Sequence, residues 1–448
     1  MEKFFDENNV TLTLSVMSDV HISGSWYQGP SKSKFINALD YARTVAKNPI
    51  DAYLFAGDFV DCMNSRGNVM LSEKWGLDYD KAKAEQSARE FETLRDCFNN
   101  HIPPESEIIY CLGNHDSTDC NNIARFIEEF SSLEEIGDNK NFERMYRTDL
   151  DLDNMRKGMR HCVCKDYHFL CIDITTDYSE TIEFLKKNLD ENTAKDPYKY
   201  VFVLFHYKTP DTLFASNVNT ADMSVALDKL LKNYPQALLI NGHTHTSVCN
   251  ERAIMQKEYT SVEGSCVSYV DSNLIHNELN VVHSMHFKVS EGLLIEIDKN
   301  GNLRITRLDY HNRSIIKDAW VLPAPKTDNS HLIVYSPDRK YKARKPEFPK
   351  GADFTLEQLE EGVKITIPKA IRNNEDIYRY QVICYNCLGA PKVYFISSLF
   401  CHRAEERYNE ATLSAIIPEA KLSDIYKITV TAQDFWYNDS EPLIKYKD

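Results

Sequence analysis

The sequence predicts an α/β domain followed by a small all-β domain. Three observations support this prediction: buried strand-like runs alternate with amphipathic helices over the first two-thirds of the chain, a Pro-, Lys- and Arg-rich stretch follows, and short β-like runs separated by turns close the sequence. The 448 residues suffice for two or three domains. We expect the α/β domain over 1–322, a linker over 323–349 and a β-sandwich over 350–448.

Hydrophobic spacing places the elements of the α/β domain. Apolar runs predict strands at 11–17, 52–56, 108–112, 167–173, 200–205 and 237–240. Apolar residues at helical spacing predict helices around 35–46, 84–98, 123–130, 182–189 and 223–230. From about 259 to 310 the runs become strand-like, and the Asn300-Gly301 pair predicts a β-hairpin turn.

Two insertions interrupt this pattern. Residues 62–105 contain Ala84, Ala88, Phe91 and Phe98 on one face of an expected helix, and residues 136–160 are polar without clear periodicity. Connecting segments of this kind often carry binding residues, so we expect both insertions to shape the pocket.

The last hundred residues read as short strands. They lie at 363–367, 378–385, 393–397, 412–417 and 426–432. Strands of this length separated by turns are typical of an immunoglobulin-like or fibronectin-like sandwich. This domain carries no catalytic cluster, so we expect it to have a structural role or to bind a protein partner or a second copy of the chain.

Composition excludes several classes of protein. The net charge of −15 argues against a broad surface for nucleic acid or anionic membrane. No apolar stretch approaches the ~20 residues of a membrane helix, and no signal peptide is evident. The twelve cysteines are therefore expected as free thiols in the cytoplasm. Cys384-Tyr-Asn-Cys387 with Cys401-His402 is an alternative zinc site, but the spacing matches no common one.

Polar motifs follow five of the apolar strands. They are Asp19-Val-His21, Gly57-Asp58-Phe-Val-Asp61, Gly113-Asn114-His115-Asp116, His206, and Asn241-Gly-His243-Thr-His245. Each has an ordinary interpretation alone: Asp58 as a helix cap, His206 as a core histidine, the Gly-Asn-His-Asp stretch as a turn. Ligand sites of open α/β sheets lie at the carboxyl ends of the strands, so together the motifs indicate one functional site.

The residue types of this set suit a metal centre. Three carboxylate or amide oxygens and four imidazoles favour Mn, Fe, Zn or Co over calcium. Seven ligands are too many for one catalytic ion, whereas two ions sharing a bridging carboxylate use them all and can hold a hydroxide at neutral pH. His115 is not needed as a ligand and stands beside Asn114, so it is the candidate general acid.

The ordered motifs resemble those of the calcineurin-like metallophosphoesterases over about residues 10 to 310. The resemblance implies two packed mixed sheets flanked by helices, a four-layer αββα sandwich. It implies that Asp19, His21 and His245 hold one metal, that Asn114, His206 and His243 hold the other, and that Asp58 bridges them. It also implies that His115 contacts the phosphate and protonates the leaving group, while Asp116 and Asp61 orient metal ligands.

The resemblance leaves the substrate open. Gly113-Asn-His-Asp116 is similar to the phosphodiesterase and acid-phosphatase branches, but Tyr207-Lys208-Thr-Pro210 replaces the His-Pro of many cyclic-nucleotide phosphodiesterases. We expect hydrolysis of a small phosphodiester or phosphomonoester, with a nucleotide or cyclic nucleotide as the leading substrate. Tyr27 and Lys208 are candidates for substrate contact, although packing at the rim explains both equally well.

Two other functions remain alternatives at this stage. The first is a scaffold that keeps the fold without turnover, which would be expected to lose ligands or the acid. The second is a nuclease, since repair nucleases share these motifs, although the acidic composition disfavours polymeric DNA.

Overall fold

The computed structural model describes residues 4–23, 31–61, 72–73, 76, 78–117, 151–174, 178–217, 221–272, 281–282, 285–371, 376–386 and 389–446. Tyr27 and the helix expected over 123–130 lie outside these ranges. The chain forms two compact units. The first comprises 1–248, 253–270 and 287–336, and the second comprises 249–252, 271–286 and 337–448.

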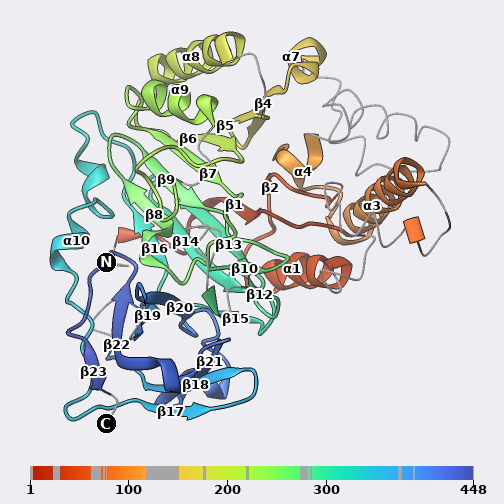
Figure 1. The fold of residues 1–448 in the computed structure, drawn as a ribbon. Coiled ribbons are helices and arrows are strands. Elements are labelled where there is room, and N and C mark those ends of the chain that lie inside the picture. Colours follow the sequence, from red (N-terminus) through yellow and green to blue (C-terminus); the bar gives the residue numbers. More distant parts are fainter. Residues whose placement is uncertain are drawn as a thin grey trace. The chain divides into compact units, whose positions relative to one another are not determined.

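A seven-stranded mixed sheet carries the first three polar motifs (Figure 1). Its strands are β1 (Val10–Met17), β2 (Ala52–Ala56), β3 (Glu107–Cys111), β13 (Glu291–Asp298), β14 (Leu303–Asp309), β15 (Ser314–Ile315) and β16 (Trp320–Leu322). β1, β2 and β3 run parallel to one another, and β13 adds to β1 antiparallel. The carboxyl ends of the three parallel strands therefore lie at the same edge.

A six-stranded mixed sheet carries the remaining motifs. Its strands are β4 (Met159–Cys164), β5 (Tyr167–Ile172), β6 (Val201–Phe205), β7 (Ala237–Asn241), β8 (Ile254–Gln256) and β9 (Thr260–Glu263). β5, β6, β7 and β9 are parallel. All residues of β6 and β7 are buried, as expected for parallel strands covered on both faces.

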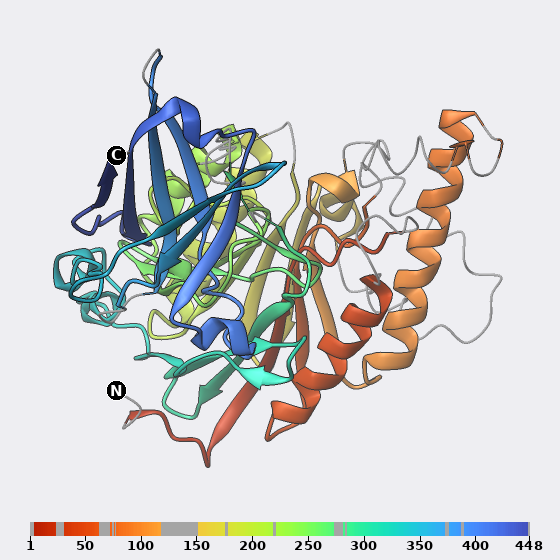
Figure 2. The same cartoon turned by 60° about the horizontal axis from the view of Figure 1, so that its bottom comes forward.

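Helices cover the outer face of each sheet. They are α1 (Ser31–Val45), α3 (Tyr79–His101), α4 (Asn114–Ser117), α7 (Leu152–Arg156), α8 (Tyr178–Lys195) and α9 (Asp222–Leu231). α1 and α3 lie side by side (Figure 2) and share a core with β1 to β3, whereas α8 and α9 share one with β5 to β7. β3 contacts β5 and β6, so the two sheets pack against each other. This is the four-layer αββα arrangement that the resemblance implied.

The described parts of the two insertions belong to the packed layers. A helix over 84–98 is confirmed within α3, where Phe91 and Phe98 are buried, but Ala88 is exposed and does not belong to the core face. Residues 151–160 contain α7 and the beginning of β4, which pairs with β5. None of the helices in the described ranges combines the length and apolar character needed to cross a lipid bilayer.

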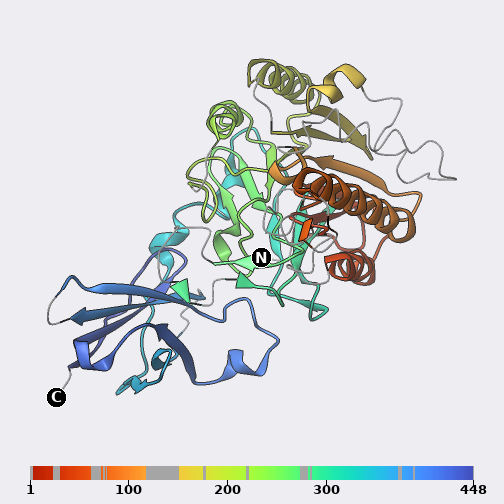
Figure 3. The same ribbon diagram turned by 45° about the vertical axis from the view of Figure 1, so that its right-hand side comes forward.

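The second unit contains two β-sheets, drawn in blue in Figure 3. One has the order β17 (Thr355–Gln358), β18 (Gly362–Pro368), β21 (Thr412–Pro418). The other has the order β11 (Val281–Val282), β20 (Lys392–Ser397), β19 (Ile377–Asn386), β22 (Ile425–Asp434), β23 (Leu443–Tyr446). Alternate residues of β18 and β21 share one core with alternate residues of β19 and β22, so the sheets pack face to face.

The remaining short elements complete the description. They are β10 (Val270–Asp271), β12 (Met285–His286), α10 (Arg339–Lys342), α11 (Glu406–Asn409) and the 3-10 turns η4 (Glu251–Ala253), η5 (Ser330–Ile333) and η6 (Leu422–Asp424). The five strands expected in the C-terminal region are all present. The Asn300-Gly301 turn joins β13 to β14, with Gly301 at φ +79°.

Candidate metal centre

Loops that follow β1, β2, β6 and β7 bring carboxylates and imidazoles together (Figure 1). In three groups of residues the potential ligand atoms lie within 4.8 Å of one another. The groups are Asp19, His21 and His245; His21, Asp58 and His115; and Asp58, His206 and His243. Asp58 and His21 each belong to two groups, so the three groups form one continuous cluster.

His206 and Asp58 meet through atoms that both accept hydrogen bonds. His206 Nδ1 lies 2.6 Å from the carbonyl oxygen of Ala56, so this nitrogen carries the hydrogen and donates it. The other nitrogen of the neutral ring, Nε2, then has a lone pair, and it lies 3.1 Å from Asp58 Oδ2. An ionised carboxylate only accepts. Two such acceptors repel each other unless a proton or a cation lies between them.

His245 shows the same pattern on the other side of the cluster. Its Nδ1 lies 3.2 Å from the carbonyl oxygen of Tyr269. Its Nε2 lies 3.1 Å from Asp19 Oδ1 and 3.1 Å from His21 Nε2. Three atoms with lone pairs thus converge on one point. Convergence of unprotonated nitrogen and carboxylate oxygen is the arrangement that a divalent cation requires.

The backbone at these motifs adopts an uncommon conformation. Five ligand candidates have positive φ without being glycine: Asp19 (50°), His21 (45°), Asp58 (55°), His243 (75°) and His245 (48°). Such residues cost of order 1–3 kcal/mol each and persist only where the surrounding structure holds them. The strain is concentrated at the cluster, as is common at functional sites.

Two glycines of the motifs make close approach to a carboxylate possible. A Cβ on Gly113 would lie 2.6 Å from the backbone nitrogen of Asp58 and 2.8 Å from its Cγ. A Cβ on Gly242 would lie 2.5 Å from Asp19 Oδ2 and would also overlap Ser18 Oγ. The glycine in each motif therefore has a steric reason in addition to turn formation.

Asp58 is held as a carboxylate. Burial alone would raise its pKa, but the positive charges of His206 and His115 outweigh burial and lower the pKa well below its usual value. Its Oδ1 accepts the backbone N–H of His115 at 2.9 Å. One oxygen thus faces the loop after β3, and the other faces His206.

His115 is more accessible than the other histidines with which it clusters. Its side chain is 24% exposed, whereas those of His21, His206 and His245 are at most 4% exposed. His115 Nδ1 lies 3.3 Å from Asp61 Oδ1, and the same oxygen lies 3.6 Å from His21 Nδ1. Asp61 therefore contacts both an expected metal ligand and the expected acid.

Asp116 is fully buried and binds backbone. Its Oδ1 accepts the N–H groups of Phe59 and Val60 at 2.9 and 3.2 Å, and its Oδ2 accepts that of Gly113 at 2.9 Å. Burial and the neighbouring carboxylate of Asp58 raise its pKa to about 7. These contacts hold the loops after β2 and β3 together, which is a positioning role and not contact with substrate.

His243 and Asn114 complete the expected ligand set. The backbone N–H of His243 donates to Asp19 Oδ2 at 3.0 Å, and burial together with the charge of His206 lowers the pKa of its ring to about 3. The ring packs 4.1 Å from that of Tyr207. Asn114 is the first residue of α4, directly before His115.

Lys208 does not lie where a substrate could reach it. It is 3% exposed, forms an ion pair with buried Glu263, and donates to Thr246 Oγ1 at 2.9 Å and to the carbonyl of Phe214 at 3.0 Å. The alternative that it is a packing residue is therefore the better interpretation. Tyr27 lies outside the described residues.

Supporting residues were missed from the sequence. Ser18 donates to Asp19 Oδ2 at 2.6 Å, and its position beside Asp19 was the available signal. Asp173 accepts the N–H of Leu112 at 2.6 Å, directly before the Gly113 motif, and pairs with buried Arg160 at 3.0 Å. No local pattern indicated Arg160, Asp173 or the carbonyl of Tyr269, because each acts through a distant partner.

The donor set fits a pair of transition-metal ions. Two clusters of carboxylate oxygen and imidazole nitrogen share Asp58, and no thiolate belongs to either. Mixed oxygen and nitrogen ligands suit Mn, Fe or Zn. When bound, the ions would be held by Asp19, His21 and His245 on one side and by His206 and His243 on the other.

Residues 12–247 match the family model described as calcineurin-like phosphoesterase, which covers more than half of the chain. The chain belongs to the calcineurin-like phosphoesterase family. The matched range contains every ligand candidate of the cluster and ends two residues after His245. Among curated proteins, none matches this phosphoesterase.

Solved structures similar to this phosphoesterase include two named enzymes. A 5'-nucleotidase precursor from Thermus thermophilus has a TM-score of 0.32 and 14% identity, covering 70% of this chain and 54% of its own. The purple acid phosphatase PPD1 from yellow lupin (Lupinus luteus) seeds has a TM-score of 0.41 and 13% identity, covering 72% and 56%. This phosphoesterase thus spans about half the length of each, and the likeness carries no argument about substrate.

Proposed function

We propose that this chain is a phosphoric ester hydrolase with a binuclear metal centre, acting on a small phosphodiester or phosphomonoester. The observation that carries the proposal is the pair of acceptor-to-acceptor contacts, His206 with Asp58 and His245 with Asp19. A nucleotide or cyclic nucleotide remains the leading substrate.

The ligand assignment follows the contacts. Asp19, His21 and His245 hold one ion; Asn114, His206 and His243 hold the other; and Asp58, which belongs to two of the clusters, bridges them. Two ions bound there would neutralise charge on the phosphoryl oxygens and lower the pKa of water to about neutral.

His115 is the proposed general acid. Its Nδ1 is engaged by Asp61, which leaves Nε2 as the nitrogen that can carry a transferable proton to the leaving-group oxygen. Its accessible side chain and its place beside Asp58 suit this role. Asp61 orients His115 and His21, and Asp116 orients the two loops.

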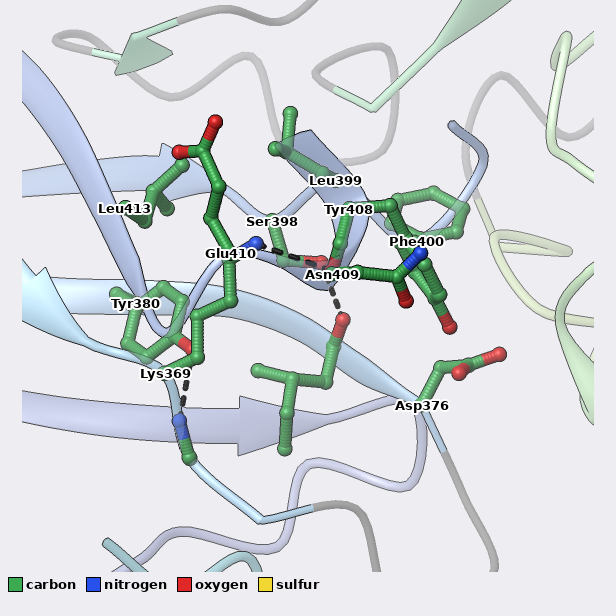
Figure 4. Close-up of a pocket in the computed structure, with 12 residues that line it drawn as sticks. Lys369, Asp376, Tyr380, Ser398, Leu399, Phe400, Tyr408, Asn409, Glu410 and Leu413 are labelled. Atoms are coloured by element: carbon green, nitrogen blue, oxygen red, sulfur yellow. Dashed lines mark hydrogen bonds between the residues drawn. The ribbon is translucent and has the colours of Figure 1, made fainter. Parts of the chain in front are cut away.

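The second unit is proposed as an immunoglobulin-like or fibronectin-like module for binding a protein partner or a second copy. The two face-to-face sheets support this. A cavity of about 160 Å³ in this unit (Figure 4) contains Lys369, but the lysine donates to the carbonyl of Tyr408, and Asp376 and Glu410 are acidic. Its lining therefore disfavours a phosphate, and the chemistry is assigned to the first unit.

A reducing, cytoplasmic location is part of the proposal. Nine cysteines in the described ranges are reduced thiols, and all nine are buried, in agreement with the expectation from the sequence.

The test uses the purified full chain loaded with Mn²⁺. We expect hydrolysis of bis(p-nitrophenyl) phosphate or p-nitrophenyl phosphate, and the ratio of the two rates gives the diester or monoester preference. His206→Ala should lose bound metal and activity. His331→Ala is the matched control, because His331 is equally buried but donates to the carbonyl of Pro235 at 3.0 Å, away from the cluster.

Each alternative predicts a different result. A chain that binds no transition metal and hydrolyses neither ester would be a scaffold. A chain that degrades plasmid or single-stranded DNA at moderate salt, but neither small ester, would be a nuclease. Either result would overturn the proposal.

A further inference from the structure

A second group of metal-capable side chains lies in the second unit. His286, Cys401 and His402 are buried, and one potential ligand atom of each lies within 4.8 Å of the others. His286 precedes His402 by 116 residues, yet His286 Nδ1 lies 2.9 Å from His402 Nε2. The group contains neither Cys384 nor any residue of the centre described above.

Hydrogen bonds assign the lone pairs of both imidazoles. His402 Nδ1 lies 2.7 Å from Glu405 Oε1 and therefore donates to it. Ser397 Oγ donates to the carbonyl of Ser398 at 3.2 Å and accepts from Ser272 Oγ at 3.0 Å. Since its one hydrogen is used, Ser397 can only accept from His286 Nε2 at 3.2 Å.

The two inner nitrogens are consequently both unprotonated. His286 Nδ1 and His402 Nε2 point lone pairs at each other across 2.9 Å, with the thiol of Cys401 beside them. A shared proton or a cation must occupy this point. A proton would place a charged imidazolium in a site where both histidines are about 95% buried, at 5% and 4% exposure.

We propose that His286, Cys401 and His402 bind a zinc ion. Two imidazoles and one thiolate suit Zn²⁺ and leave one position of a tetrahedral ion for water. The thiol loses its proton on binding. Glu405 and Ser397 accept the outer N–H groups, which is the usual support for histidines that bind zinc.

The ion would join two parts of the second unit. His286 ends the segment 271–286, whose strand β11 pairs with β20, and Cys401 and His402 follow the end of β20. His402 N–H donates to the carbonyl of Leu399 at 2.9 Å, so a turn presents both ligands to His286. The role is structural: it fixes this segment to the sheet.

The test uses the full chain loaded with Co²⁺, because a thiolate bound to cobalt gives a charge-transfer absorption that oxygen and nitrogen ligands do not. We expect this absorption in the wild type, its loss in Cys401→Ser, and its retention in Cys384→Ser, a buried cysteine of the same unit on β19. Absence of the band in the wild type, or its survival in Cys401→Ser, would overturn the zinc site in favour of a shared proton.

Two further measurements avoid dependence on that variant. X-ray absorption of the zinc-loaded wild type should contain a sulfur neighbour at about 2.3 Å, and its absence would also overturn the proposal. Glu405→Gln should weaken zinc at this site about 10–100-fold. Activity on bis(p-nitrophenyl) phosphate should survive in Cys401→Ser, so failure of this site and failure of the proposed function are separable.

Discussion

His206 Nε2 and Asp58 Oδ2 lie 3.1 Å apart although, with the ring neutral and its hydrogen on Nδ1, neither atom has a hydrogen to donate. The contact joins the loop after β6 to the loop after β2, and therefore joins the two sheets at their common edge. It is the clearest sign in the first unit that a cation belongs between these side chains.

Asp58→Asn should disturb both metals together. The bridging position requires two carboxylate oxygens, and an amide nitrogen cannot bind a cation. We expect loss of both ions by elemental mass spectrometry and turnover lower by more than about 10²-fold. Full occupancy of both sites in the variant would contradict the bridge.

Metal binding should release protons. In the metal-free chain burial disfavours the charged form of His206, but Asp58 outweighs burial and raises its pKa to about 9. A bound metal must displace that proton, so affinity for Mn²⁺ should rise as the pH increases from about 6 to about 9. Calorimetric titrations in buffers of different ionisation enthalpy measure the release directly, and equal heats would argue against it.

The same shift predicts how the metal-free chain responds to pH. A histidine with a raised folded-state pKa contributes stability below its ordinary value of 6.5, and the contribution is lost as the pH rises through about 9. Urea unfolding of the metal-free chain should therefore show a smaller free energy at pH 9 than at pH 6, and His206→Ala should reduce this difference.

His115→Ala should retain both metals but lower turnover by about 10²–10⁴-fold, the usual contribution of a general acid. His101→Ala is the matched control, since His101 is 26% exposed and lies 3.4 Å from a carboxylate of Asp40. Substrates with a good leaving group need less protonation and should lose less. An unchanged rate on a poor leaving group would remove His115 from the mechanism.

Gly242→Ala should weaken the metal held by Asp19, His21 and His245. The new Cβ would lie 2.5 Å from Asp19 Oδ2, so the carboxylate must move. We expect at least about a tenfold loss of metal affinity, comparable to removal of a residue that supports a ligand. Gly389→Ala, whose Cβ would meet nothing within 4 Å, is the control and should behave as wild type.

Asp173→Asn should lower the free energy of unfolding by about 3–5 kcal/mol, because it leaves the buried guanidinium of Arg160 without a counter-charge. Glu85→Gln, in the exposed Glu85–Arg89 pair, should change stability little. Thermal unfolding of both variants decides, and equal melting temperatures would show that the buried pair contributes nothing.

The ligand set and the layered fold could be predicted from the sequence because both are encoded locally. A polar motif directly after an apolar strand reports where that strand ends, and parallel strands place their carboxyl ends at one edge. Asp19, Asp58, His206 and His245 are therefore found from four separate local patterns, and the structure brings them together.

Other features depend on contacts between distant segments. Lys208 follows a ligand in sequence yet is buried against Glu263, and the helical face that includes Ala88 is turned away from the core. The partner of Arg160 and the partner of His286 lie on other elements, so no local spacing indicates them.

By itself, the sequence determined which side chains stand at the ends of the strands, because periodicity records burial and strand ends locally. Only the tertiary structure decided which atoms of those side chains face one another, that Asp61 engages His115, and that His286 meets Cys401 and His402. The physical reason is that lone pairs and hydrogens are assigned by neighbours in space, and those neighbours are remote along the chain.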